Sequence, residues 1–125
     1  MSGTVPNTAE TTRHAFRLEQ LEDGVTILYF DLPDEKVNKL TTEVLLELEQ
    51  VLIRVSKDSS VKALVFMGGK EGTGTFNAGA DINEIKDVTV AAEATEKARQ
   101  AQGILHRFST LPKPTIAVIH GTCLG

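Results

Sequence analysis

The residues of this sequence best suited to chemistry form one short run, Phe76-Asn77-Ala78-Gly79-Ala80-Asp81-Ile82. The run follows an apolar segment, residues 61–67, and a glycine-rich loop, residues 68–75, and it opens onto a helical pattern. Small side chains let a ligand approach the backbone closely, and the start of a helix offers free N–H groups to negative charge. We therefore predict an oxyanion hole here, in which backbone donors point at an oxygen that gains charge during a reaction.

Nearby titratable side chains allow either a chemical or a structural role. Asp81 can act as a general base, bind a metal ion or cap the helix that it opens. Capping is favoured, because Glu84 completes a pair of the capping-box kind and no second carboxylate or histidine stands at metal-ligand spacing. His120 can serve acid–base chemistry or the structure, and the lack of a partner carboxylate favours the structural role. Lys36 is a candidate phosphate contact, although its spacing alone favours a solvated lysine.

The glycines do not form a nucleotide-binding motif. Lys70 is followed by Glu71, where a phosphate-binding loop has Ser or Thr. The segment Gly72-Thr73-Gly74 lacks the third glycine of a dinucleotide fingerprint and does not lead directly from a strand into a helix. Residues 68–74 are more typical of a flexible surface loop.

Composition and charge exclude several classes of protein. The 125 residues form at most one ordinary domain, or part of one, and the 41% hydrophobic and 24% charged content is that of a soluble globular protein. The net charge of −4, without a basic block, argues against nucleic acid as a partner. No apolar stretch approaches the roughly 18 residues of a membrane span. Residues 1–14 are polar and indicate a loose tail rather than a secretion signal.

Cys123 is the single cysteine of the chain, so an intrachain disulfide is excluded. This favours a reducing, cytoplasmic location. We expect Cys123 to be a small buried hydrophobic residue rather than a reactive thiol.

The periodicity predicts an alternation of strands and helices. Phe16 and Leu18 alternate with polar residues, Asp23-Gly24 forms a turn, and Val25–Leu32 resumes as a strand, so we predict a hairpin. Apolar residues then recur at helical spacing over residues 42–57, with Thr41 or Thr42 as the cap.

The alternation of strand and helix continues in the second half of the chain. Residues 61–66 indicate a buried strand, and a short helix capped by Asp81 runs through Lys86. A longer helix carries a stripe of mostly small residues that can approach closely whatever it covers; these are Ala91, Ala94, Ala98, Ala101, Leu105 and Phe108. Prolines end it, and Thr115–Ile119 is a further apolar strand. The order predicts an α/β domain with right-handed crossovers between parallel strands.

These elements are too few for a closed core. A parallel strand at residues 115–119 needs neighbours on both edges and cover on both faces. Three or four strands and two long helices do not supply this. We therefore expect a truncated chain, with a small complete domain as the alternative.

Three segments carry a resemblance to a known family, both in their residues and in their order and spacing along the chain. They are Asp31–Leu40 (DLPDEKVNKL), Phe76–Ile82 (FNAGADI) and Pro112–Gly125 (PKPTIAVIHGTCLG). Together they resemble the enoyl-CoA hydratase/isomerase (crotonase) superfamily. The resemblance implies an α/β, crotonase-like spiral of ββα units, here its incomplete N-terminal portion. Residues 1–15 are then a flexible tail, and residues 16–125 are the N-terminal part of an enoyl-CoA hydratase/isomerase domain.

The resemblance also implies roles for individual residues. The backbone N–H of Ala80 corresponds to one oxyanion donor of the family. The acyl-CoA site would further include Lys36 near the phosphates and Ala78 at the adenine. Its remaining members are Asp81, Ile82 and Asn83.

The implied activity is that of an enoyl-CoA hydratase, a lyase of fatty acid β-oxidation that converts 2-enoyl-CoA into 3-hydroxyacyl-CoA. The second oxyanion donor of the family follows the position of Gly125, and the two catalytic glutamates lie further on. We therefore expect these residues alone to be inactive. Isomerase, thioesterase or dehalogenase chemistry stays open, as does a non-catalytic chain that only docks to partners.

The segments Glu35–Leu40 and His120–Gly125 most resemble the α subunits of bacterial fatty acid oxidation complexes. In those multifunctional proteins the hydratase/isomerase domain precedes an NAD-dependent 3-hydroxyacyl-CoA dehydrogenase. The resemblance implies no cofactor for this segment beyond the coenzyme A of its thioester substrate, and NAD only with a downstream dehydrogenase domain. It also implies a homo-oligomer or a complex with a thiolase subunit.

Overall fold

The structure is a computed structural model that describes residues 14–125. The tail expected at residues 1–15 therefore lies outside the described residues, except for its last two. Of these, Ala15 is buried; its N–H donates to the Glu47 carboxylate at 3.0 Å, and its carbonyl accepts from the Asp31 N–H at 2.7 Å. These two bonds fix the backbone of Ala15 beside β2 and α2.

The predicted hairpin is confirmed. Strand β1 (Phe16–Gln20) pairs antiparallel with β2 (Val25–Phe30) across a short 3-10 turn, Glu22–Gly24. Strand β2 ends two residues before the predicted Leu32. The Leu32 N–H donates to the side-chain oxygen of Asn38 at 2.8 Å instead of to a neighbouring strand.

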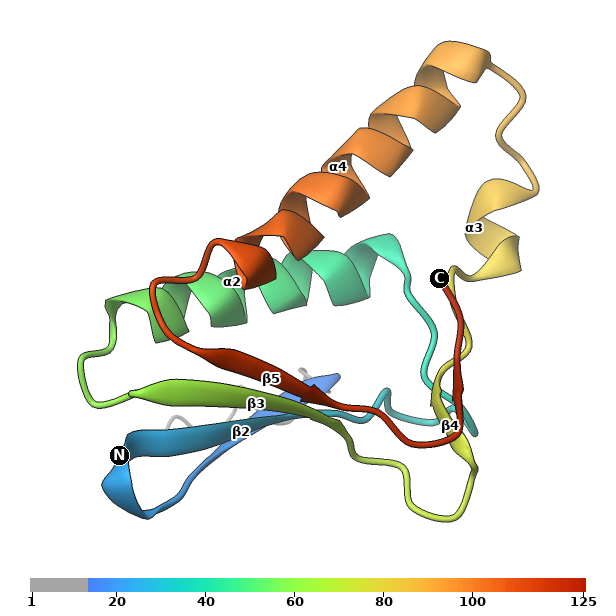
Figure 1. Ribbon diagram of the computed structural model, residues 1–125. Helices are drawn as coiled ribbons and strands as arrows, with labels where there is room; N and C mark the ends of the chain where they lie inside the picture. Colours follow the sequence, from blue (N-terminus) through green and yellow to red (C-terminus); the bar gives the residue numbers. More distant parts are fainter. Residues whose placement is uncertain (1–13) are drawn as a thin grey trace, which may run out of the picture.

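The main sheet has four strands in the order β1-β2-β3-β5. Strands β3 (Ala63–Gly68) and β5 (Thr115–Val118) run parallel to β2, as predicted. The helix α2 (Thr42–Lys57) connects β2 to β3, and α4 (Ala91–Ser109) precedes β5. Both helices lie on the same side of the sheet, with α4 above α2 and its first half extending past the N-terminal end of α2 (Figure 1).

The core lies between the sheet and α2. Alternate residues of β2 and one stripe of α2 are buried; they include Leu28, Phe30, Val44, Leu48, Leu52 and Val55. The Phe16 and Phe30 rings stack at 4.8 Å. The Phe66 ring lies 5.3 Å from Phe76 and 5.0 Å from Phe108. Aromatic packing therefore connects the sheet to the run Phe76–Ile82 and to α4.

A second, two-stranded sheet stands at one end of the first. It consists of β4 (Thr75–Asn77) and β6 (Thr122–Cys123), which are parallel (Figure 1). The expectation that Cys123 is buried is wrong: this thiol is exposed. Strand β6 pairs with β4 on one edge, and nothing in residues 14–125 covers its outer side. Strand β5 is likewise exposed, with Ile116 at 56% and Val118 at 41%.

No helix within residues 14–125 is long and apolar enough to cross a membrane.

Candidate functional site

The run around Ala80 is held in place by the segment that precedes α2. Leu40 donates its N–H to the Gly79 carbonyl at 2.8 Å and accepts the Asp81 N–H at 3.0 Å. Leu40 and Ala80 thus form an isolated parallel bridge. Residues 79–81 are therefore held by the backbone of a segment 40 positions earlier.

The N–H of Ala80 has no acceptor within residues 14–125, whereas the neighbouring amides are engaged. Ala78 donates to the Asn38 carbonyl at 2.8 Å, and Gly79 donates to the side-chain oxygen of Asn77 at 3.1 Å. In a parallel bridge the two residues that flank the bridged one make the bonds, so the N–H of the bridged residue points away from the partner segment. Ala80 is an exposed residue.

Asn38 organises this backbone and was missed as a site residue in the sequence. Its side chain is fully buried. The amide nitrogen donates to the Phe30 carbonyl at 2.7 Å and to the Phe76 carbonyl at 3.2 Å, and the oxygen accepts the Leu32 N–H. An asparagine in a polar loop gives no periodic signal, so its burial could not be read from the pattern.

Gly79 occupies a backbone conformation that favours glycine, with φ of 97°. A Cβ at this position would lie 3.6 Å from the backbone of Leu124. That segment is fixed to the run by two bonds: the Leu124 N–H donates to the Asn77 carbonyl at 2.9 Å, and the Asn77 amide donates to the Leu124 carbonyl at 3.0 Å. The end of the chain therefore lies along the edge of the run opposite Leu40.

A hollow of about 450 Å³ adjoins the free amide. Its walls come from the start of α2, from Ala80 and Asp81, from the short helix α3 (Ile82–Ile85) and from one face of α4. The α4 residues are mostly small: Ala94, Lys97, Ala98, Ala101 and Leu105. The predicted alanine stripe therefore borders an open space instead of covering another element, and the buried residue of α4 is Ile104.

The other predicted site residues are placed as follows. Asp81 caps α3, as favoured, and its carboxylate accepts the Asn83 N–H at 2.9 Å. Ile82, Asn83 and Lys36 are exposed, and Ala78 is half-buried; none of these four lines the hollow.

His120 lies apart from the hollow. Its exposed ring packs edge-on against the Phe76 ring, with centroids 6.2 Å apart. This contact agrees with the structural role that the sequence favoured. Within residues 14–125, no cluster of three or more His, Cys, Asp or Glu residues is arranged to hold a metal ion.

The capping box expected of Asp81 and Glu84 does not form. The Asp81 N–H donates to Leu40 rather than to Glu84. The Glu84 carboxylate instead accepts both the N–H and the hydroxyl of Thr42, each at 2.9 Å. The prediction is wrong because the fold brings the start of α2 close to Glu84, whose carboxylate accepts two donors from Thr42 there.

The loop beside the run carries an ion pair. Lys39 lies 2.9 Å from the Glu35 carboxylate. The hydrogen bond to Glu35 raises the pKa of Lys39, and the negative charges of Glu35 and Asp81 add to the effect. A cation is therefore maintained next to the helix cap.

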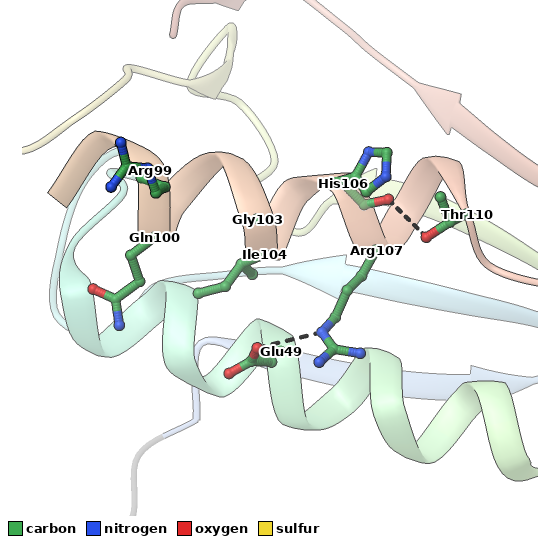
Figure 2. Close-up of a pocket in the computed structure, with 8 residues that line it drawn as sticks. All are labelled: Glu49, Arg99, Gln100, Gly103, Ile104, His106, Arg107 and Thr110. Carbon is green, nitrogen blue, oxygen red and sulfur yellow. Dashed lines mark hydrogen bonds and ion pairs between the residues drawn. The ribbon is translucent and has the colours of Figure 1, made fainter. Parts of the chain in front are cut away.

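A second hollow, of about 500 Å³, lies between α2 and α4 (Figure 2). Glu49 of α2 and Arg107 of α4 pair across it at 3.3 Å. None of the residues predicted to bind or react lines it. The hollow at Ala80 is therefore the candidate site.

Comparisons with known proteins show the family of this chain. The family model described as Enoyl-CoA hydratase/isomerase matches residues 20–125. The chain is 40% identical over 111 residues to the fatty acid oxidation complex subunit alpha of Idiomarina loihiensis. The aligned segment covers 89% of this chain and 15% of that protein.

Solved structures show the same fold. DspI of Pseudomonas aeruginosa superposes with a TM-score of 0.75 at 26% identity, over 90% of this chain and 41% of that chain. An enoyl-CoA hydratase from Shewanella pealeana superposes with a TM-score of 0.77 at 21% identity, over 95% of this chain and 44% of that chain. The chain thus spans less than half the length of these solved relatives and a smaller share of the curated one.

Proposed function

Since the chain belongs to the enoyl-CoA hydratase/isomerase family, we propose that its Ala80 N–H binds the thioester carbonyl oxygen of an acyl-CoA. The observation that carries this proposal is the amide itself, which has no acceptor within residues 14–125 and lies beside a largely apolar hollow. The residues on both sides of this N–H are fixed by hydrogen bonds. Such a donor needs no reorganisation when charge develops on the oxygen that it faces.

We propose that the reaction is hydration of a 2-enoyl-CoA to a 3-hydroxyacyl-CoA in fatty acid β-oxidation. Polarisation of the carbonyl stabilises an enolate-like state, water oxygen bonds to C3, and a proton is delivered to C2. General acid–base groups must handle the water and that proton. The family resemblance assigns them, and the second oxyanion donor, to positions after Gly125, so these 125 residues alone are proposed to bind substrate without turnover.

The same binding mode accounts for the other predicted contacts. The acyl chain would occupy the hollow between α3 and α4, while the coenzyme A portion would pass Ala78, Ile82 and Asn83. Lys36 is exposed and cationic, and it would meet the phosphates. Lysine serves phosphates as a mobile point charge, so an exposed position on a loop suits that role.

Partners and location are proposals of the same kind. The curated relative is a subunit of a fatty acid oxidation complex. We propose that the complete protein forms a homo-oligomer or a complex with a thiolase subunit in the cytoplasm. NAD would be needed only by a downstream dehydrogenase domain.

The test is an assay of the complete protein with two substrates. Hydration of a 2-enoyl-CoA removes the absorbance of the conjugated thioester and yields a 3-hydroxyacyl-CoA that chromatography identifies. Isomerisation of a 3-enoyl-CoA would create that absorbance instead. Hydration as the faster reaction supports the proposal. Turnover of the 3-enoyl substrate alone, or release of free coenzyme A, would replace hydratase by isomerase or thioesterase.

A further inference from the structure

We propose that Glu84 is a positioning residue of this site: its carboxylate fastens α3 to the start of α2 and so holds the Ala80 N–H against the hollow. The inference rests on the proposed role of Ala80. Glu84 itself would not touch the reacting atoms.

The contact joins two elements that are far apart in the chain. One carboxylate oxygen of Glu84 accepts the Thr42 N–H and the Thr42 hydroxyl, both at 2.9 Å, over a separation of 42 residues. Thr41 caps the same helix by accepting the Val44 N–H at 3.1 Å. Glu84 thus satisfies an additional N–H of the first turn of α2, where the helix dipole favours negative charge.

Apolar packing does not fix α3, which gives this contact its importance. The helix has four residues and buries none of them within the described structure. Its two apolar side chains are largely open, with Ile82 at 70% and Ile85 at 52% exposure. A helix of this length has little stability of its own, so its attachments determine where it lies.

Two attachments flank the proposed donor. On one side, the bonds of Leu40 to Gly79 and Asp81 hold the backbone of the run. On the other, Glu84 ties the short helix α3, which follows the run, to the start of α2. Asp81, Glu84 and Thr42 all line the hollow, so loss of the second attachment would displace its wall together with the oxyanion donor.

The experiment measures kcat and KM of the complete protein for a 2-enoyl-CoA in Glu84→Ala and Glu84→Gln. A donor that acts on the transition state affects kcat more than KM, and displacement by about 1 Å can cost about 100-fold. We expect a 10- to 100-fold fall in kcat for Glu84→Ala with KM changed less than about 3-fold. Glu84→Gln keeps an acceptor oxygen for Thr42 and should recover most of kcat.

Asp87→Ala is the matched control, because it removes an exposed carboxylate just after α3 that does not line the hollow. It should leave both constants within about 2-fold, a surface-substitution effect. An unchanged kcat in Glu84→Ala overturns the inference, and so does a loss in Glu84→Gln equal to that in Glu84→Ala.

Amide hydrogen exchange of peptides covering residues 78–86 separates this inference from the proposed function. Faster exchange in Glu84→Ala but not in Asp87→Ala supports the tether, even if the wild-type protein does not hydrate enoyl-CoA. If the wild type is active and exchange is unchanged in Glu84→Ala, the positioning role is wrong while the proposed function stands.

Discussion

Leu40 lies opposite Ala80 in a parallel bridge, and both hydrogen bonds of that bridge belong to the neighbours of Ala80. The Gly79 carbonyl and the Asp81 N–H are used, which leaves the Ala80 N–H directed at the other edge. The bridge therefore both fixes the backbone and leaves one donor free. A donor of this kind can be removed without loss of an internal hydrogen bond.

Ala80→Pro tests the donor, because proline has no N–H to give. In the complete protein we expect kcat to fall by about 100- to 1000-fold, the usual cost of losing one oxyanion donor. Ala80→Gly retains the N–H and serves as the control, with kcat within about 3-fold of wild type if the donor is what matters. Both variants are compared by steady-state kinetics, with thermal unfolding to verify that they fold. Full activity of the proline variant would remove Ala80 from the site.

Asn38→Ala should be strongly destabilising. The substitution leaves the half-buried Leu32 N–H and the carbonyls of Phe30 and Phe76 without their side-chain partner. Each buried group that loses its bond costs about 1–3 kcal/mol, so we expect the free energy of unfolding to fall by about 3 kcal/mol. Denaturant titration measures the change. A loss below about 0.5 kcal/mol, the scale of a surface substitution, would contradict the central role of this amide.

Thr26→Val should stabilise the protein, in contrast to Asn38→Ala, although Thr26 is also buried. Its hydroxyl is the buried side-chain polar atom without a hydrogen-bond partner within residues 14–125, and the residue is 2% exposed. Valine has the same shape without the unsatisfied oxygen, so we expect the free energy of unfolding to rise by about 1 kcal/mol. The same denaturant titration checks this. Destabilisation would mean that the hydroxyl has a partner in solution, such as an ordered water.

Gly121→Ala should disrupt the pairing of β4 with β6. Gly121 has φ of 66°, and a Cβ there would overlap the carbonyl oxygen of Gly74, which accepts the Thr122 N–H at 2.9 Å. Gly72→Ala is the matched control, since Gly72 has φ of 81° but open space around it. Both variants bear the backbone strain of about 1 kcal/mol, and only Gly121→Ala adds the overlap. Hydrogen exchange at Thr122 and Leu124 should accelerate in Gly121→Ala alone.

Ser60→Ala should change the pH response of Asp58. The Ser60 hydroxyl donates to the Asp58 carboxylate at 2.6 Å and its N–H at 2.9 Å, and these bonds, the hydroxyl first, lower the pKa of Asp58. Because the folded pKa lies below the unfolded one, the stabilisation is present above the ordinary carboxyl pKa and is lost as pH falls through the folded pKa. NMR titration should show the pKa of Asp58 rising in Ser60→Ala and staying low in Ser60→Thr, which keeps the hydroxyl. An unmoved pKa in Ser60→Ala would contradict this cause.

Much of the fold could be predicted because it follows from local patterns. The hairpin at Asp23-Gly24, the helix over residues 42–57 with its Thr41 cap and the Asp81 cap of α3 all depend on residues within a few positions of one another. The α/β, crotonase-like fold implied by the three segments is confirmed by the solved structures that superpose on the chain. Cys123 was misplaced because its burial depends on what lies beside β6, not on its neighbours in the chain.

The sequence itself determined the order of elements, the small residues around Ala80 and the family. Side-chain period, turn residues and motif spacing are local properties, so they can be read from the sequence. Only the tertiary structure decided which amide is left free, which asparagine is buried and which donor Glu84 meets. Those outcomes depend on contacts between residues about 40 positions apart, such as Asn38 with Phe76 and Thr42 with Glu84. Hydrogen bonds over that separation are set by the path of the chain, and no short pattern records it.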